Sequence, residues 1–129
     1  MTKRILIVDD DAKNLKLVRD ILNSNGYLTF EAVNGKEAIE LAINQIPDLI
    51  LMDIQMPVMD GLQAIRILKT NDDAKHIPII ALTAFSMKGD KEKVLLYGAD
   101  DYLSKPISIK ILLGLIKKYI GNKESSDCV

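Results

Sequence analysis

Acidic residues follow two of the most apolar segments of the chain. The run Asp9–Asp11 comes directly after Ile5–Val8, and Asp53 comes directly after Leu49–Met52. If the two apolar segments are neighbouring strands of a parallel sheet, their carboxyl ends bring at least three carboxylates to one edge. Two such charges about 4 Å apart repel by roughly 4 kcal/mol at an effective dielectric near 20, so the cluster requires a cation or raised pKa values. Oxygen ligands without His or Cys favour Mg²⁺, and the sequence therefore predicts a magnesium site.

A simpler interpretation of the acidic run is helix capping. An amphipathic helix is expected to begin near Lys13, and one Asp in front of it would serve as its N-cap. Asp11 is the candidate for that cap. Capping does not account for all of the successive acids, so the metal site remains the stronger explanation for Asp9 and Asp10.

A hydroxyl and an ammonium group follow two further segments of the same kind. Thr83 comes after Ile79–Leu82, and Lys105 comes after Asp101–Ser104. Either side chain alone is most simply a backbone-satisfied hydroxyl or a solvated lysine, but both can bind phosphoryl oxygens. A metal held by carboxylates, a carboxylate that attacks phosphorus, and a Lys and Thr that hold the transferred group are the parts that phosphoryl transfer requires. The combination indicates phosphoryl transfer to a carboxylate.

The elements that must position these residues alternate regularly along the chain. Short apolar segments, expected as strands, are Ile5–Val8, Leu28–Ala32, Leu49–Met52, Ile79–Leu82 and Asp101–Ser104. Between and after them, apolar residues recur at spacings of three and four, which is typical of helices with one buried stripe. The stripes are Leu15, Val18 and Leu22; Ala38, Ile39, Ala42, Ile43 and Ile46; Leu62, Ile65 and Leu68; and Ile109, Leu112, Leu113, Ile116 and Ile120. A less regular helix is expected around residues 88–97, and the alternation predicts an α/β fold with a parallel sheet covered on both faces.

Length, composition and charge exclude several classes of protein. The 129 residues, 48% hydrophobic and 27% charged, suit one domain with a well-filled core. The net charge of −1 gives no overall reason to expect nucleic-acid binding. The single cysteine, Cys128, cannot form an internal disulfide, and no apolar run has the length of a signal peptide or a membrane span. We expect a reduced, cytoplasmic protein without membrane insertion or direct nucleic-acid contact.

The positions of the site residues resemble those of a known family. Over about residues 3 to 120, the chain is similar to response-regulator receiver domains of the CheY-like superfamily. The matching positions are Asp9-Asp10, Asp53, Thr83-Ala84, Tyr102 and Lys105-Pro106, together with the segment Met52–Gly61 after the acceptor strand. The segment Thr83–Asp90 further resembles stand-alone receivers of the DivK type, although receivers fused to hybrid histidine kinases use very similar sequences, so an excised receiver stays an alternative.

The resemblance implies a fold, a boundary and a metal site. The fold would be a doubly wound, flavodoxin-like sheet of five strands in the order 2-1-3-4-5 with five helices, formed by residues 1–121 and followed by a flexible tail over 122–129. Asp53 would accept a phosphoryl group from a histidine kinase or a histidine phosphotransfer protein, or slowly from small phosphodonors. Mg²⁺ would be held by Asp10, Asp53 and the backbone carbonyl of Gln55, with Asp9 assisting through a metal-bound water.

The resemblance also implies a switch. Thr83 and Lys105 would bind the phosphoryl oxygens, and Tyr102 would turn inward as Thr83 moves. This movement would alter the face made by the fourth helix, the fifth strand and the fifth helix, which would bind a downstream protein. The protein would then be a phosphoacceptor switch with slow self-dephosphorylation and not an enzyme in the usual sense.

Two further residues bear on how long the phosphoryl group survives. Gln55 and Phe85 lie two positions after Asp53 and Thr83, where they are expected to flank the approach of water to phosphorus. Gln55 could orient a water molecule, but the apolar ring of Phe85 offers no hydrogen bond. We predict slow self-dephosphorylation, with the alternative that Phe85 faces a partner-binding surface and leaves hydrolysis unchanged.

Three other functions fit the residues less well. A Mg²⁺-dependent aspartyl-phosphate phosphohydrolase needs a second carboxylate two residues after its nucleophile, where this chain has Gln55. A flavin-binding module needs a Ser/Thr/Gly-rich loop after the first strand, where Asp9–Asp11 would repel a phosphate. A transcription factor needs a DNA-binding module, and the nine residues after the last expected helix are too few for one.

Overall fold

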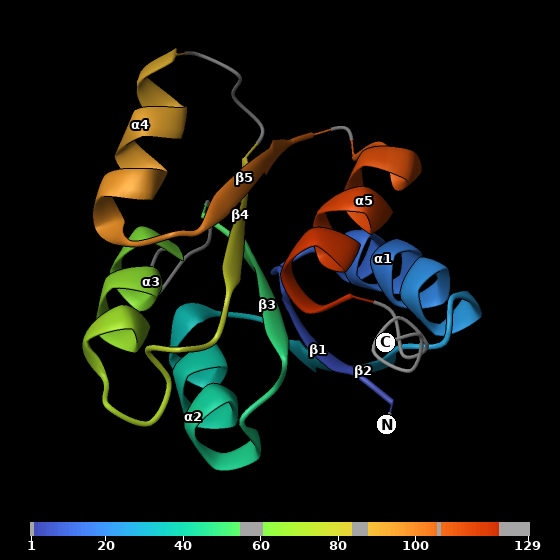
Figure 1. Cartoon of the computed structure of the whole chain (residues 1–129), viewed down its shortest axis with the longest axis horizontal. Helices are drawn as coiled ribbons and strands as arrows, with labels where there is room; N and C mark the ends of the chain where they lie inside the picture. The colour runs from blue at the N-terminus through green and yellow to red at the C-terminus, as the bar shows by residue number, and fades with distance from the viewer. Residues whose placement is uncertain (1, 55–60, 84–87, 106, 122–129) are drawn as a thin grey trace.

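The strands and helices alternate as the sequence predicts. A computed structural model describes residues 2–54, 61–83, 88–105 and 107–121 (Figure 1). Its elements are β1 (Arg4–Val8), α1 (Ala12–Ser24), β2 (Leu28–Ala32), α2 (Gly35–Gln45), β3 (Leu49–Asp53), α3 (Gly61–Thr70), β4 (Ile79–Thr83), α4 (Lys88–Tyr97), β5 (Asp101–Ser104) and α5 (Ile109–Ile120). All neighbouring strands are parallel, in the order β2-β1-β3-β4-β5. The predicted α/β fold and its strand order are therefore confirmed.

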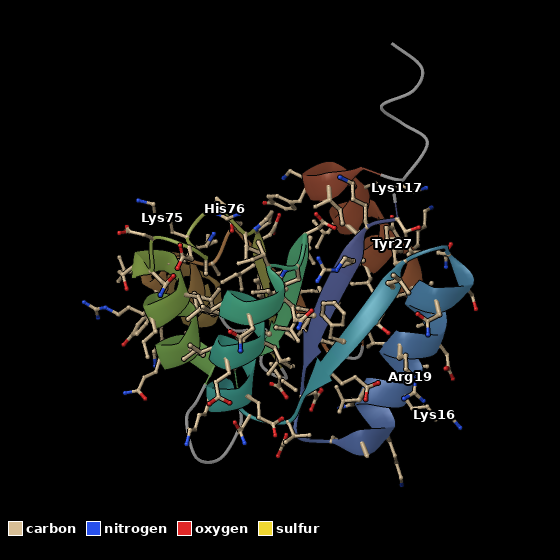
Figure 2. The ribbon with its side chains drawn as sticks, turned by 90° about the horizontal axis from the view of Figure 1, so that it is seen from below. Lys16, Arg19, Tyr27, Lys75, His76 and Lys117 are labelled. Carbon is tan, nitrogen blue, oxygen red and sulfur yellow. The ribbon has the colours of Figure 1, made fainter. Side chains whose placement is uncertain are left out.

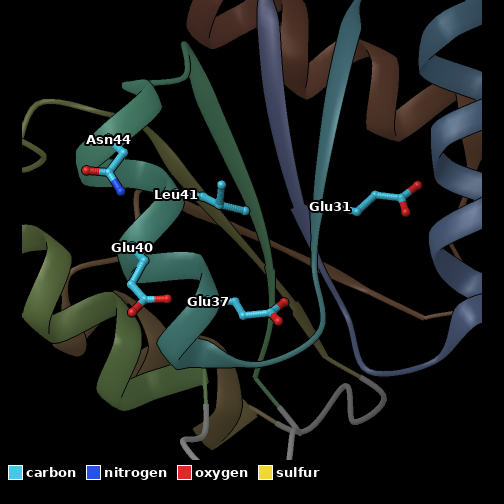
Figure 3. Close-up of a pocket in the computed structure, with 5 residues that line it drawn as sticks. All are labelled: Glu31, Glu37, Glu40, Leu41 and Asn44. Carbon is cyan, nitrogen blue, oxygen red and sulfur yellow. The ribbon is translucent and has the colours of Figure 1, made fainter.

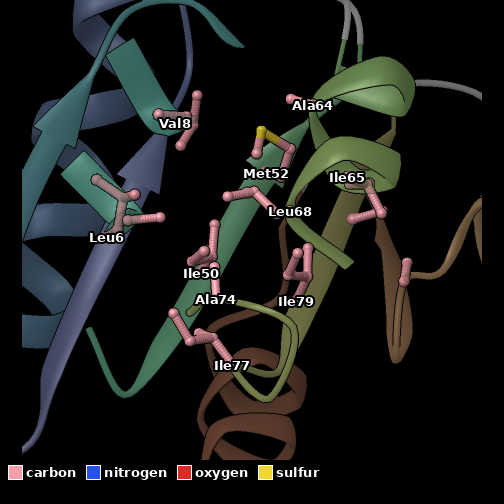
Figure 4. Close-up of a cluster of buried hydrophobic side chains, with 14 of the residues drawn as sticks. Leu6, Val8, Ile50, Met52, Ala64, Ile65, Leu68, Ala74, Ile77 and Ile79 are labelled. Atoms are coloured by element: carbon pink, nitrogen blue, oxygen red, sulfur yellow. The ribbon is translucent and has the colours of Figure 1, made fainter. Parts of the chain in front are cut away.

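Helices cover both faces of the sheet, which explains why the central strands are apolar on both alternations. Helices α1 and α5 lie on one face, and α2, α3 and α4 lie on the other (Figure 1). Every residue of β3 and β4 is buried. The core beneath α2 and α3 includes Leu6, Ile50, Met52, Ile65 and Leu68 (Figure 4). None of the helices in the described ranges is long and apolar enough to cross a membrane.

Two apolar residues of the predicted helical stripes lie largely outside the core. Helix α2 ends at Gln45, and Ile46 is its C-cap in the left-handed region, with φ of 46° and 38% exposure. Ile109 is the first residue of α5 and is 51% exposed. The spacing of three and four continues through both residues, but periodicity carries no information about where a helix begins or ends.

Carboxylate side chains accept hydrogen bonds from the backbone at the amino ends of β1 and β4. Asp48 Oδ2 accepts a hydrogen bond of 2.8 Å from the backbone N–H of Arg4, where β1 begins. Asp100 Oδ2 accepts one of 2.8 Å from Ile79, where β4 begins. The Lys69 ammonium, on α3, lies 2.7 Å from the same Asp100 oxygen. These contacts fix the edge of the sheet that lies opposite the carboxyl ends of the strands.

Helix α3 begins in close contact with the end of β3. The backbone N–H of Gly61 donates to the carbonyl of Ile54 at 3.3 Å. A Cβ at Gly61 would overlap the Asp53 carbonyl oxygen and lie 2.5 Å from Ile54 Cα. These obstacles are backbone atoms, which cannot move aside as a flexible side chain can. Only glycine therefore allows α3 to start directly against Asp53.

We expect Gly61→Ala to lower the free energy of unfolding by about 1–3 kcal/mol, because the added methyl group must displace α3 or the end of β3. Urea unfolding followed by circular dichroism measures the change. Gly114→Ala is the matched control, since nothing lies within 4 Å of a Cβ there and alanine is the better helix former by up to about 1 kcal/mol. Equal stability of Gly61→Ala and the wild type would contradict the packing argument.

Candidate functional site

Three carboxylates meet at the carboxyl ends of β1 and β3. These strands are neighbours, and Val8 of β1 is in register with Met52 of β3. The residues that follow, Asp9 and Asp53, therefore lie side by side, and each is only 2% exposed. Carboxylate oxygens of Asp9, Asp53 and the exposed Asp10 all lie within 4.8 Å of one another. The structure thus brings together the acids that the sequence predicts at this edge.

Hydrogen bonds hold the turn that carries these acids. The backbone N–H of Asp9 donates to the Ala32 carbonyl at 3.1 Å and extends the pairing of β1 with β2. Asp9 Oδ1 accepts a bond of 2.9 Å from the backbone N–H of Asp11. Asp11 Oδ1 accepts one of 2.9 Å from Lys13, which makes Asp11 the N-cap of α1 and confirms that prediction. The turn after β1 is therefore fixed on both sides of Asp10.

Lys105 reaches the acids from the far side of the site. Its backbone N–H donates to the Thr83 carbonyl at 2.7 Å, which holds Lys105 against the end of β4. Its ammonium nitrogen lies 3.1 Å from Asp53 Oδ2 and 3.4 Å from Asp9 Oδ2. Thr83, fully buried, ends the strand between β3 and β5. The structure therefore places the predicted hydroxyl and ammonium groups at the same edge as the carboxylates.

The charges of the site do not balance. Burial lowers the pKa of Lys105, but the hydrogen bond and charge of Asp53, together with those of Asp9, outweigh it and hold the pKa above its usual value. The ammonium is therefore charged at neutral pH. With all three carboxylates ionised, one positive charge opposes three negative ones, a net charge of −2 in the described part of the site. A divalent cation would cancel this charge, and a donor set made only of carboxylate oxygens fits Mg²⁺.

The other predicted residues divide into two groups. Tyr102 lies on β5, in register with Ala81 of β4, and its half-buried side chain packs against the core on the α2, α3 and α4 face. Tyr102 therefore lies on the strand next to Thr83, two register positions before it. Gln55 and Phe85 lie outside the described residues, as does the tail over 122–129.

Sequence reasoning missed one residue of the site and one contact. The resemblance includes Gly61 only as the last residue of the segment Met52–Gly61, yet its missing side chain is what permits the close approach to Asp53. The direct contact of Lys105 with Asp9 was also missed, because residues 96 positions apart carry no local pattern that links them.

Curated relatives match nearly the whole chain. The chain is 48% identical over 122 residues to the polar-differentiation response regulator DivK of Brucella anthropi, which covers 95% of this chain and 99% of that protein. It is 47% identical over the same length to the protein of that name from Brucella ovis, with the same coverage. At this identity and coverage the relatives share the whole fold.

Solved structures of receivers superpose closely. The receiver domain of the sensor histidine kinase PA1611 from Pseudomonas aeruginosa, solved with a magnesium ion in its active-site cleft, is 36% identical with a TM-score of 0.87 over 95% of this chain and 100% of that one. The chemotaxis response regulator CheY4 of Vibrio cholerae is 28% identical with a TM-score of 0.87 over 93% of this chain and 100% of that one. The family model of the response regulator receiver domain matches residues 5–117. The chain therefore belongs to the response regulator receiver domains of two-component systems, and within them it is similar to DivK.

Proposed function

We propose that the chain accepts a phosphoryl group on Asp53 from a phosphorylated histidine of a kinase or a histidine phosphotransfer protein. The observation that carries this proposal is the Asp53 carboxylate, buried at the end of the central strand with the Lys105 ammonium 3.1 Å away and two further acids beside it. A buried acid held in one position by a lysine suits a nucleophile whose product is then recognised by the same lysine.

In the proposed transfer, one bond to phosphorus forms as another breaks. An Asp53 carboxylate oxygen forms a bond to phosphorus while the phosphorus–nitrogen bond of the phosphohistidine breaks. The imidazole nitrogen leaves with the electron pair, and the phosphoryl group becomes an acyl phosphate on Asp53. Lys105 then moves from the carboxylate oxygen to a phosphoryl oxygen, and the Thr83 hydroxyl donates to another. No proton is needed from Asp53, which reacts as the ionised carboxylate.

Asp10, Asp53 and the backbone carbonyl of Gln55 would hold Mg²⁺, with Asp9 assisting through a bound water. The bound ion supplies positive charge that offsets the negative charge of the carboxylates and of the incoming phosphoryl oxygens. The net charge of −2 among the described side chains supports this assignment, because an anionic phosphoryl group would otherwise approach a site of its own sign.

Phosphorylation would be read out on the face made by α4, β5 and α5. Thr83 and Tyr102 lie on the adjacent strands β4 and β5, two register positions apart, so a shift of the hydroxyl toward a phosphoryl group would change the space available to the ring. Exposed apolar side chains are present on both of its helices, with Leu96 of α4 85% exposed and Ile111 of α5 55% exposed. A downstream protein that binds these side chains in one state only would receive the signal.

The remaining assignments follow from this role. Residues 1–121 would form the receiver and 122–129 a flexible tail, and the protein would act in the cytoplasm, without direct contact with nucleic acid or membrane insertion. It would work as a switch that phosphorylates and slowly dephosphorylates itself rather than as an enzyme acting on other substrates. A receiver excised from a hybrid histidine kinase is the second candidate, favoured by the 36% identity with the receiver of the histidine kinase PA1611.

We expect Asp53→Asn to abolish phosphorylation, because an amide oxygen is a poor nucleophile and the neutral side chain holds Lys105 less strongly. Incubation with Mg²⁺ and acetyl phosphate, followed by intact mass measurement, should show one added phosphoryl group on the wild type and none on the variant. Asp73→Asn, which changes an exposed acid in the turn after α3, is the control and should be phosphorylated fully. Full phosphorylation of Asp53→Asn would exclude Asp53 as the acceptor.

We expect Mg²⁺ to bind measurably without phosphate, because the carboxylates repel one another when the ion is absent. Titration calorimetry should show binding that weakens on acidification, since the carboxylates must be ionised to bind the metal. Asp10→Ala should weaken binding markedly, whereas Asp72→Ala, with an acid 94% exposed after α3, should not. Equal affinity in the wild type and Asp10→Ala would show that the ion binds elsewhere.

We expect Phe85→Glu to shorten the lifetime of the acyl phosphate by about ten- to thirtyfold, the effect of restoring one group that positions water for attack on phosphorus. Decay of the phosphorylated protein, followed by intact mass after removal of the phosphodonor, gives the rate. Ile67→Glu places the same charge on the exposed side of α3 and should leave the rate unchanged. Equal decay in the wild type and Phe85→Glu would assign Phe85 to a partner-binding surface instead.

A further inference from the structure

Strand β2 presents an open edge at the opposite end of the sheet from β5. The backbone N–H of Leu28 donates to the Lys3 carbonyl, and the Ala32 carbonyl accepts from Asp9, so both of these residues direct their polar groups toward β1. Because a parallel ladder alternates, Thr29 and Glu31 direct their backbone N–H and C=O groups away from β1. Viewed from this side, β2 lies in front, with α2 and α1 flanking it and no described segment along its edge (Figure 2).

An acidic groove accompanies this edge. It has a volume of about 600 Å³ and lies between β2 and α2 (Figure 3). The residues that line it are Glu31, Glu37, Glu40, Leu41 and Asn44, and the Glu31 side chain among them turns away from α2 toward α1 (Figure 3). Glu37 and Glu40 on α2 bring negative charge to the groove. They lie beside the outward backbone groups of Thr29 and Glu31, which pair with no backbone group among the described residues.

The acids of the groove are only partly compensated. Glu31 forms an ion pair of 2.9 Å with Arg19 of α1. Glu37, in the first turn of α2, accepts a hydrogen bond of 3.0 Å from the backbone N–H of Val33 and forms no ion pair with a described residue. Glu40 has no ion pair within the described ranges. At the two ends of the edge, Leu28 is 54% exposed and Val33 is 45% exposed, so apolar surface frames the acidic groove.

We propose that this edge binds an extended basic segment of a partner protein as an added strand. The backbone of the segment would pair with the outward N–H and C=O groups of Thr29 and Glu31, and lysine or arginine side chains on one alternation would face Glu37 and Glu40. Apolar side chains of the segment would contact Leu28 and Val33. Main-chain pairing supplies affinity in this mode of recognition, and the side chains supply specificity.

The charges select this occupant over the others that an open edge could attract. A second copy joined edge to edge would place the same glutamates opposite each other, and an acidic peptide, a nucleic acid or an anionic lipid surface would be repelled in the same way. The site is also separate from the face of α4, β5 and α5, because β2 and β5 are opposite edges of the sheet. A partner bound here would leave that face accessible.

The test uses an eight-residue peptide of alternating lysine and valine with a fluorescent label, titrated in the presence of Mg²⁺ so that the acids around Asp53 are not the attraction. We expect binding by fluorescence anisotropy, with amide shifts confined to residues 28–33 and to α2. A peptide of alternating glutamate and valine should not bind. A lysine–valine peptide methylated on alternate backbone nitrogens should bind much more weakly, because it cannot complete the ladder.

The double variant Glu37→Gln with Glu40→Gln should weaken binding about three- to tenfold, the effect of losing two partly exposed ion pairs. Glutamine at position 37 keeps an oxygen for the Val33 N–H, so the fold should be retained. Glu92→Gln, an exposed position on α4, is the matched control and should bind as the wild type does. Equal binding of the lysine–valine and glutamate–valine peptides would overturn the proposal, as would amide shifts centred on Asp9–Asp11 or on α4 and α5. Absence of binding would also overturn it, and the glutamates would then only protect the edge from aggregation.

Discussion

The carboxyl edge of the sheet depends on one contact, in which the Lys105 ammonium pairs with the two buried carboxylates of Asp9 and Asp53. Asp9 and Asp53 are each 2% exposed, and buried carboxylates of one sign are costly unless a cation compensates them. Lys105 supplies that compensation from the position directly after β5, with its ammonium 3.1 Å from Asp53 and 3.4 Å from Asp9. In the proposed phosphoryl transfer, the same interaction would stabilise the resting site and place Lys105 where it can bind a phosphoryl oxygen.

Only the topology makes this contact possible, because its members are far apart in the chain. Lys105 is 52 residues from Asp53 and 96 from Asp9. In a parallel sheet, the carboxyl ends of all strands lie at the same edge. The strand order places β1 and β3 next to each other in the middle of the sheet. Register matters as much as order, since a slip of one residue would turn each side chain to the opposite face. Gly61 allows α3 to begin directly against the backbone of Asp53 and Ile54.

The elements and their edge residues could be predicted from sequence because short-range patterns encode them. Short apolar runs predicted the strands and the acids that follow them, and apolar residues spaced by three and four predicted the helices. The position of Asp11 in front of a helix predicted its role as the N-cap. Ile46 and Ile109 show where periodicity stops being informative, because apolar spacing continues across a helix end. Gly61 and the reach of Lys105 to Asp9 depend on atoms brought together by folding, so no local pattern could reveal them.

The contacts of Asp48 and Asp100 with the backbone at the amino ends of β1 and β4 distinguish the two ends of the sheet. There, the Asp48 and Asp100 carboxylates accept hydrogen bonds from backbone N–H groups, and the Lys69 ammonium forms an ion pair with Asp100. At the carboxyl ends of the strands, the Lys105 ammonium pairs with Asp9 and Asp53, and Asp10 lies beside these two acids. Amide hydrogen exchange should then follow two regimes, with slow, global opening at the amino edge and faster, local opening at the carboxyl edge. Such a difference would let the proposed phosphorylation site rearrange without loosening the rest of the sheet.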